Sequence, residues 1–132
     1  MKRYVAMLRT DADDRDITET ALKETGIDVP LRFIADMDEL ESIIKESGEP
    51  SLVLLNDNDA AHKGYEKIVQ LKSNDLYSHI PLIVLAEVST DEYVKKCYKA
   101  GANSFITKPS TIAATNKKIS GFFDYWFNVA EL

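Results

Sequence analysis

The feature that most constrains the fold is the run Leu52–Leu55, four apolar residues that lead directly into Asn56 and Asp57. Pro50 precedes this run, and Gly64 follows it after a polar stretch, so turn-forming residues bound it on both sides. A short apolar run with such boundaries is typical of a parallel strand that helices cover on both faces. Ligands of open α/β sheets bind at the carboxyl ends of the strands. The sequence therefore predicts a functional site at Asn56 and Asp57.

Apolar segments of this kind alternate with segments in which apolar residues recur at helical spacing. Helix-start signals support the alternation: Asp36 with Glu39 resembles a capping box, and Ser89 or Thr90 precedes the fourth helical segment. This pattern predicts a doubly wound α/β domain built on a parallel sheet. The predicted strands span residues 4–8, 29–35, 52–56, 80–86 and 104–107.

The composition narrows the classes of function. A chain of 132 residues suits one compact domain over residues 1–132, and we expect no output domain after the last helix. The net charge of −6 disfavours nucleic-acid binding, which needs clustered Lys and Arg. The apolar runs are too short for a membrane span and no signal peptide opens the chain, so we expect a cytoplasmic protein. The single cysteine, Cys97, excludes an internal disulfide.

Three segments carry a family resemblance. Residues 100–109, AGANSFITKP, resemble the end of the fourth helix, the fifth strand and the Lys-Pro turn of the response-regulator receiver domain, the CheY-like family of two-component systems. Residues 80–85 resemble its fourth strand, and residues 121–126 are similar to a single-domain subgroup associated with phytochrome kinases. The resemblance implies a flavodoxin-like sheet of five parallel strands in the order 2-1-3-4-5. It also implies a function in phosphorelay signalling, with a sensor histidine kinase or another signalling protein as partner.

The position that accepts the phosphoryl group in this family is Asn56. The register is supported by spacing, since Gly64, Ala86 and Lys108 lie eight, thirty and fifty-two residues further on. The family places a serine or threonine at the position of Ala86. An amide is a poor nucleophile because its nitrogen lone pair is delocalised, so we expect Asn56 to form no acyl phosphate.

The acidic pair that holds Mg²⁺ in the family falls on Arg9 and Thr10, which Asp11 follows. Mg²⁺ requires near-octahedral oxygen ligands, typically carboxylates and waters. The loss of carboxylates and the added cation predict no metal and no cofactor here. We hypothesise that Arg9 takes the space of the metal and pairs with Asp11 or Asp57.

Of the family's chemical positions only Lys108 keeps its residue type. The resemblance places Pro109 after a cis peptide bond and Phe105 at the position of the switch aromatic. Without an acceptor, we expect Lys108 to form a structural ion pair with Asp57 or Asp11.

Two alternatives to a docking module stay open. In the first, Asp57 is a displaced phosphoryl acceptor that works with Mg²⁺, although the simpler interpretation makes it a solvated acid of the loop that follows the strand. In the second, the chain is a small flavodoxin-like enzyme. We rank this last because the loop after the first strand is acidic and lacks the glycines of a phosphate-binding loop. The acidic cluster in the helix after it is interpreted as a solvated face, formed by Asp13, Asp14, Asp16 and Glu19.

The last helix carries more apolar residues than one stripe against the sheet requires. Aromatic side chains are enriched at protein interfaces. We therefore expect a homodimer through the region of this helix. The predicted interface residues are Phe122, Phe123, Trp126 and Phe127.

Overall fold

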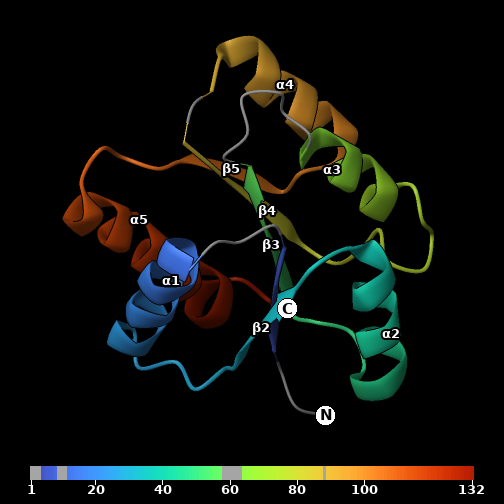
Figure 1. The fold of residues 1–132 in the computed structure, drawn as a ribbon, viewed down its shortest axis with the longest axis horizontal. Coiled ribbons are helices and arrows are strands. Elements are labelled where there is room, and N and C mark those ends of the chain that lie inside the picture. The colour runs from blue at the N-terminus through green and yellow to red at the C-terminus, as the bar shows by residue number, and fades with distance from the viewer. Residues whose placement is uncertain (1–3, 9–11, 58–63, 88) are drawn as a thin grey trace.

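The computed structural model describes residues 4–8, 12–57, 64–87 and 89–132. It contains a sheet of five parallel strands in the order β2-β1-β3-β4-β5, with helices on both faces (Figure 1). The predicted fold class and strand order are therefore confirmed. The strands are β1 (Val5–Leu8), β2 (Leu31–Ile34), β3 (Leu52–Asp57), β4 (Leu82–Ala86) and β5 (Ser104–Thr107). The helices are α1 (Ala12–Glu24), α2 (Met37–Ser47), α3 (Gly64–Lys72), α4 (Asp91–Ala100) and α5 (Ile112–Asp124), which the π-helical η1 (Tyr125–Val129) continues.

The helices form two layers, and each layer covers its own apolar core. Helices α1 and α5 lie on one side of the sheet and α2, α3 and α4 on the other (Figure 1). Along β3, Leu52 and Leu54 belong to the core under α1 and α5, whereas Val53 and Leu55 belong to the core under the other three helices. Side chains of a strand alternate between its faces. The next residue of β3, Asn56, should therefore face α1 and α5, and Asp57 should face α3 and α4.

Local capping explains where several helices begin and end. The Asp36 carboxylate accepts a 2.9 Å hydrogen bond from the Glu39 N–H, and Glu39 accepts a 3.2 Å bond from the Ala35 N–H. The predicted capping box is thus present, with its return bond one residue earlier than in the standard form. Thr90, and not Ser89, caps α4.

Two sequence predictions about elements are wrong. Asp57 is the last residue of β3 and is 2% exposed, so it does not begin the polar loop. Phe122 and Phe123 are buried in the core beneath α5, so they are not available to a partner. Their rings pack against each other, with centroids 4.6 Å apart.

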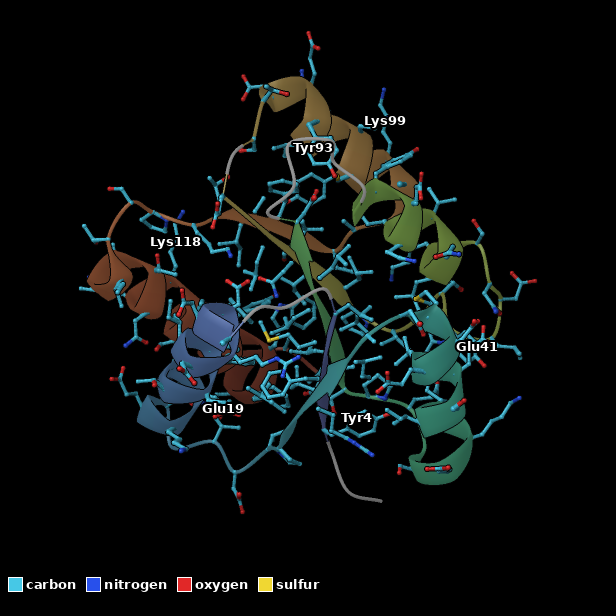
Figure 2. All side chains as sticks on the ribbon, viewed as in Figure 1. Tyr4, Glu19, Glu41, Tyr93, Lys99 and Lys118 are labelled. Atoms are coloured by element: carbon cyan, nitrogen blue, oxygen red, sulfur yellow. The ribbon has the colours of Figure 1, made fainter. Side chains whose placement is uncertain are left out.

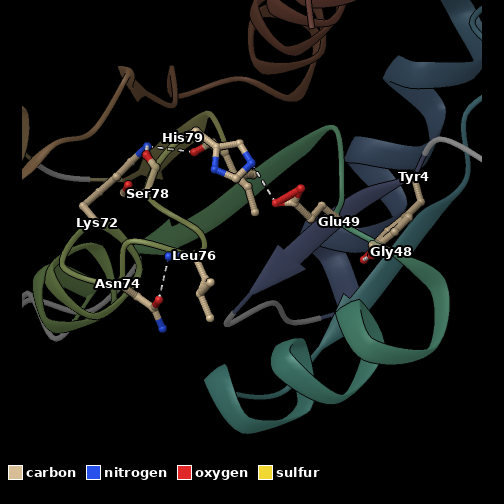
Figure 3. A network of polar contacts seen from close by, with 9 residues as sticks. Tyr4, Gly48, Glu49, Lys72, Asn74, Leu76, Ser78 and His79 are labelled. Atoms are coloured by element: carbon tan, nitrogen blue, oxygen red, sulfur yellow. Dashed lines mark hydrogen bonds and ion pairs between the residues drawn. The ribbon is translucent and has the colours of Figure 1, made fainter.

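The amino edge of the sheet is held by polar contacts between loops (Figure 3). The Lys72 ammonium donates to the carbonyls of Ser78 at 2.9 Å and Ile80 at 2.7 Å, which fixes the connection from α3 to β4. Burial lowers the pKa of Lys72. His79 and Glu49 form an exposed 2.7 Å contact at the same edge. These contacts lie at the end of the sheet opposite to Asn56, so they stabilise the domain without entering the predicted site.

Candidate functional site

The carboxyl edge of the sheet brings most of the predicted site residues together. Asp57 is the register partner of Ala86, and Ala86 is the register partner of Thr107. The Lys108 N–H donates to the Ala86 carbonyl at 2.7 Å, which carries the chain past the end of β5. Asn56 and Lys108 therefore meet at this edge although 52 residues separate them. The predicted residues Arg9, Thr10 and Asp11 lie outside the described residues.

Lys108 joins the end of β3 to α1. Its ammonium lies 2.7 Å from a carboxylate oxygen of Asp14 and donates to the Asn56 amide oxygen at 3.4 Å. The side chains of Lys108 and Asp14 are only 11% and 10% exposed. Asn56 is 1% exposed, and its amide nitrogen has no hydrogen-bond acceptor among the residues that the structure describes. On the α1 side of the sheet, the site therefore consists of the buried Asp14–Lys108 ion pair and the adjacent amide of Asn56.

This ion pair corrects one prediction and refines another. Asp14 is buried, so it does not belong to a solvated helix face as the sequence suggested, whereas Asp13 and Asp16 are exposed as expected. The ion pair predicted for Lys108 is present, but its described carboxylate belongs to Asp14. The cause is geometric: Asp14 lies in the first turn of α1, which the fold places over the carboxyl edge near the end of β5.

Asp57 projects to the other face of the sheet, toward α3 and α4. One of its carboxylate oxygens accepts a hydrogen bond from the Tyr93 hydroxyl of α4. Burial, together with the hydrogen bond to Asp57, raises the pKa of Tyr93. The interpretation of Asp57 as a solvated acid is therefore wrong, because the alternation along β3 turns its side chain into the layer between sheet and helices.

Tyr93 also contacts the predicted switch aromatic. The rings of Tyr93 and Phe105 meet edge to face, with centroids 6.0 Å apart and planes at 83°. The Phe105 N–H donates to the Tyr98 hydroxyl at 3.0 Å. Sequence reasoning missed Tyr93 as a site residue. The available signal was its spacing of four residues from Cys97, which puts both side chains on one face of α4.

The peptide bond before Pro109 is trans, so the cis bond implied by the resemblance is not present here. The Pro109 carbonyl accepts a 3.2 Å hydrogen bond from the Thr115 hydroxyl, which joins the turn to α5. A groove of about 750 Å³ lies between this turn and α1. Its rim includes the carboxylates of Asp13, Asp16 and Glu87, which give the groove a negative charge.

Within residues 4–8, 12–57, 64–87 and 89–132, no three His, Cys, Asp or Glu side chains are grouped as metal ligands. Asp14, the carboxylate on the Asn56 face, is bound to Lys108, and Asp57 projects from the opposite face. In the same described part of the chain, no helix has the length and apolarity that crossing a membrane requires.

The fold and this edge define a class of signalling domain. A five-stranded parallel sheet in the order 2-1-3-4-5, with a lysine after β5 directed at the end of β3, is the arrangement of a CheY-like receiver. The family described as "Response regulator receiver domain" matches residues 9–120, and the chain belongs to this family. Receiver domains are components of two-component signalling, where they interact with sensor kinases or other signalling proteins.

Individual relatives share this length and fold. "Response regulator Rcp1" of Synechocystis is 23% identical over 136 residues, covering 98% of this chain and 92% of the relative. The structure of the Mn²⁺-bound form of Rcp1 superposes with a TM-score of 0.84 at 22% identity, covering 98% of both chains. That of the phosphorylated cyanobacterial phytochrome response regulator RcpA gives 0.85 at 20% identity, covering 100% of this chain and 99% of RcpA. At this identity, the structural likeness to these two response regulators concerns the fold.

Proposed function

We propose that this chain is a receiver that signals by docking to a sensor histidine kinase or another signalling protein without being phosphorylated. The observation that carries the proposal is the buried amide of Asn56, which lies at the end of β3 with its oxygen toward the Lys108 ammonium. An amide at this point offers no nucleophilic carboxylate oxygen. Docking is then governed by the concentration and the affinity of the partner.

The geometry around Asp57 disfavours it as a displaced acceptor. Its side chain faces α3 and α4, whereas the Lys108 ammonium and Asn56 are together on the α1 side of the strand. The Asp57 carboxylate is also engaged by Tyr93 and shielded from solvent. A phosphoryl donor would have to open this layer before it could reach an oxygen of Asp57.

We further propose that the domain binds neither Mg²⁺ nor a cofactor. The support is the Asp14–Lys108 ion pair, because an ammonium 2.7 Å from the carboxylate competes with a divalent cation for the same oxygen. The net charge of −6 and the absence of a basic cluster in the sequence support a protein partner and not a nucleic acid. We also infer a cytoplasmic location, where two-component receivers meet their kinases.

Phosphorylation can be tested directly by incubation with acetyl phosphate and Mg²⁺ followed by intact mass measurement. We expect no mass gain in the wild-type protein or in the matched control Asp57→Asn. The variant Asn56→Asp restores a carboxylate at the family's acceptor position and serves as a comparison. A gain of one phosphoryl group in the wild type that disappears in Asp57→Asn would establish the alternative function and refute the proposal.

We still propose a homodimer, but through a smaller surface than the sequence predicted. Trp126 and Phe127 are partly buried against the core, while Tyr125 and Val129 are 50% and 66% exposed. All four residues lie in η1, which therefore carries apolar side chains both toward the core and toward solvent. Such a surface is typical of a site that a second protein surface covers.

A further inference from the structure

The contact between Asp57 and Tyr93 joins two elements that are 36 residues apart in sequence. Asp57 ends the central strand and Tyr93 lies in the first turn of α4, on the side that faces the sheet (Figure 2). Asp57 is 2% exposed and Tyr93 is 6% exposed. A hydroxyl that donates to a buried carboxylate makes a charge-assisted hydrogen bond, which is stronger than a bond between neutral groups.

The carboxylate of Asp57 is also confined from the side of α3. A Cβ atom added to Gly64, the first residue of α3, would lie only 2.8 Å from the Asp57 carboxyl carbon. The side chain therefore occupies a closed space between β3, α3 and α4. This space leaves the carboxylate little freedom to turn away from the Tyr93 hydroxyl.

Helix α4 depends strongly on Tyr93 for its attachment to the sheet. Of its residues, Tyr93 and Cys97 are the buried ones. Its other described side-chain contacts lie nearer the surface: Lys96 stacks over the Tyr65 ring at 4.1 Å, and the Tyr98 hydroxyl accepts from the Phe105 N–H. A helix with few buried side chains belongs to the part of a fold that opens at low free-energy cost.

We propose that the Asp57–Tyr93 hydrogen bond is a latch, which holds α4 and the adjoining β5 surface in one arrangement when closed and frees them when opened. The ring of Tyr93 transmits this constraint, because it packs edge to face on Phe105 of β5. Opening the latch moves a helix without any covalent change at Asn56. A partner that binds the released form more tightly shifts the chain to that form.

The latch is tested by hydrogen exchange of the free protein, followed for peptides from α4, β5, α1 and α2. Tyr93→Phe removes the hydroxyl and keeps the ring that packs on Phe105. We expect exchange in α4 to rise about tenfold or more, the factor expected for the loss of one bond to a charged group, while α1 and α2 stay within about twofold. The matched control is Tyr125→Phe, which removes an exposed hydroxyl in η1 on the other face and should leave α4 unchanged.

A second variant changes the other partner of the hydrogen bond, so the test does not depend on whether Tyr93→Phe folds. Asp57→Leu removes the acceptor and fills the same buried space with an apolar side chain. If the two groups act as one latch, the double variant exchanges in α4 no faster than the faster single variant, because the effects of coupled groups do not add. Unchanged exchange in α4, a uniform rise in all helices, or additive effects of the two changes would each refute the latch. None of these results depends on phosphorylation, so the proposed function is tested separately.

Discussion

Two aspartate side chains, Asp14 and Asp57, are buried in this domain. They have the same chemistry but lie in different environments. Asp14 is neutralised by the ammonium of Lys108, and Asp57 is held by the hydroxyl of Tyr93. A charge inside a protein is stable only when it is paired or well hydrogen-bonded. Each of these carboxylates therefore makes the fold depend on one partner from a distant segment.

Removal of one member of the Asp14–Lys108 pair should destabilise the domain. We expect Lys108→Met to lower the free energy of unfolding by about 3 kcal/mol, because the Asp14 carboxylate is then buried without its cation. Chemical denaturation measures the effect. The double variant Asp14→Leu with Lys108→Met should recover most of the loss, since it removes both charges of this pair. A change of less than about 0.5 kcal/mol in the single variant would show that solvent or another group replaces the ammonium.

The raised pKa of Tyr93 predicts a dependence of stability on alkaline pH. Burial is the main cause, and the bond to Asp57 adds to it. In the folded state the neutral phenol is favoured, whereas in the unfolded chain the phenol ionises near its ordinary pKa of 10.0. The stability that depends on neutral Tyr93 is complete below that pH and is lost as the pH rises above it. Denaturation curves between about pH 8 and pH 11 should therefore fall more steeply for the wild type than for Tyr93→Phe. Equal slopes would contradict the assignment.

Among the helices and strands, α4 shows how specific residues fix both ends of an element. The helix begins at the cap Thr90 and ends at Gly101, whose φ of 116° lies in the left-handed region. The carbonyls of Cys97 and Tyr98 accept hydrogen bonds from the Gly101 N–H. Gly101 also packs against the neighbouring α3, because the Lys72 side chain lies directly over it. The end of α4 is therefore fixed by backbone geometry as well as by packing.

Gly101→Ala should destabilise the domain by about 1–2 kcal/mol, because a side chain is strained at this φ. Its Cβ would also lie 2.7 Å from Cγ of Lys72 and displace the side chain that fixes the connection to β4. Thermal unfolding measures the loss. Gly121→Ala is the matched control: it lies within α5, and no side chain of the described residues beyond its chain neighbours lies within 4 Å of the added Cβ, so it should raise stability by up to about 1 kcal/mol. The same sign for both variants would contradict this explanation.

At the scale of the whole molecule, the two layers of helices divide the surface into regions with different tasks. The layer of α1 and α5 covers the ion pair and continues into η1 with its exposed apolar side chains. The layer of α2, α3 and α4 covers Asp57 and the latch. The proposed self-association through η1 and the proposed movement of α4 therefore involve opposite faces of one sheet, and we expect them to be independent.

Self-association should depend on the exposed apolar residues of η1. We expect the wild-type protein to dimerise with rising concentration in sedimentation velocity measurements. Combining Tyr125→Arg with Val129→Glu should weaken the dimer at least tenfold, because both side chains are half or more exposed and neither is in the core. The control Leu76→Ser changes an exposed apolar residue on another part of the surface. A monomer at every concentration, or equal effects of both changes, would refute this interface.

The strands and their parallel arrangement were accessible from the sequence, because apolar runs and helix caps are local or periodic signals. The strand order and the acceptor position followed from the resemblance to the receiver family, with the spacing of Asn56, Ala86 and Lys108 in support. The strand bounds were less exact: β2 and β4 are shorter than their apolar segments, and β3 extends to Asp57.

Only the tertiary structure decided which groups meet. The amino-acid sequence by itself determined that residue 56 is an amide and that a lysine follows the fifth strand. It did not determine that this lysine pairs with Asp14, 94 residues away, or that Asp57 turns to the opposite face and binds Tyr93. The physical reason is that side-chain partners are chosen by the face that each strand residue takes and by the helix packed over it. Both follow from the assembled layers and not from any local pattern.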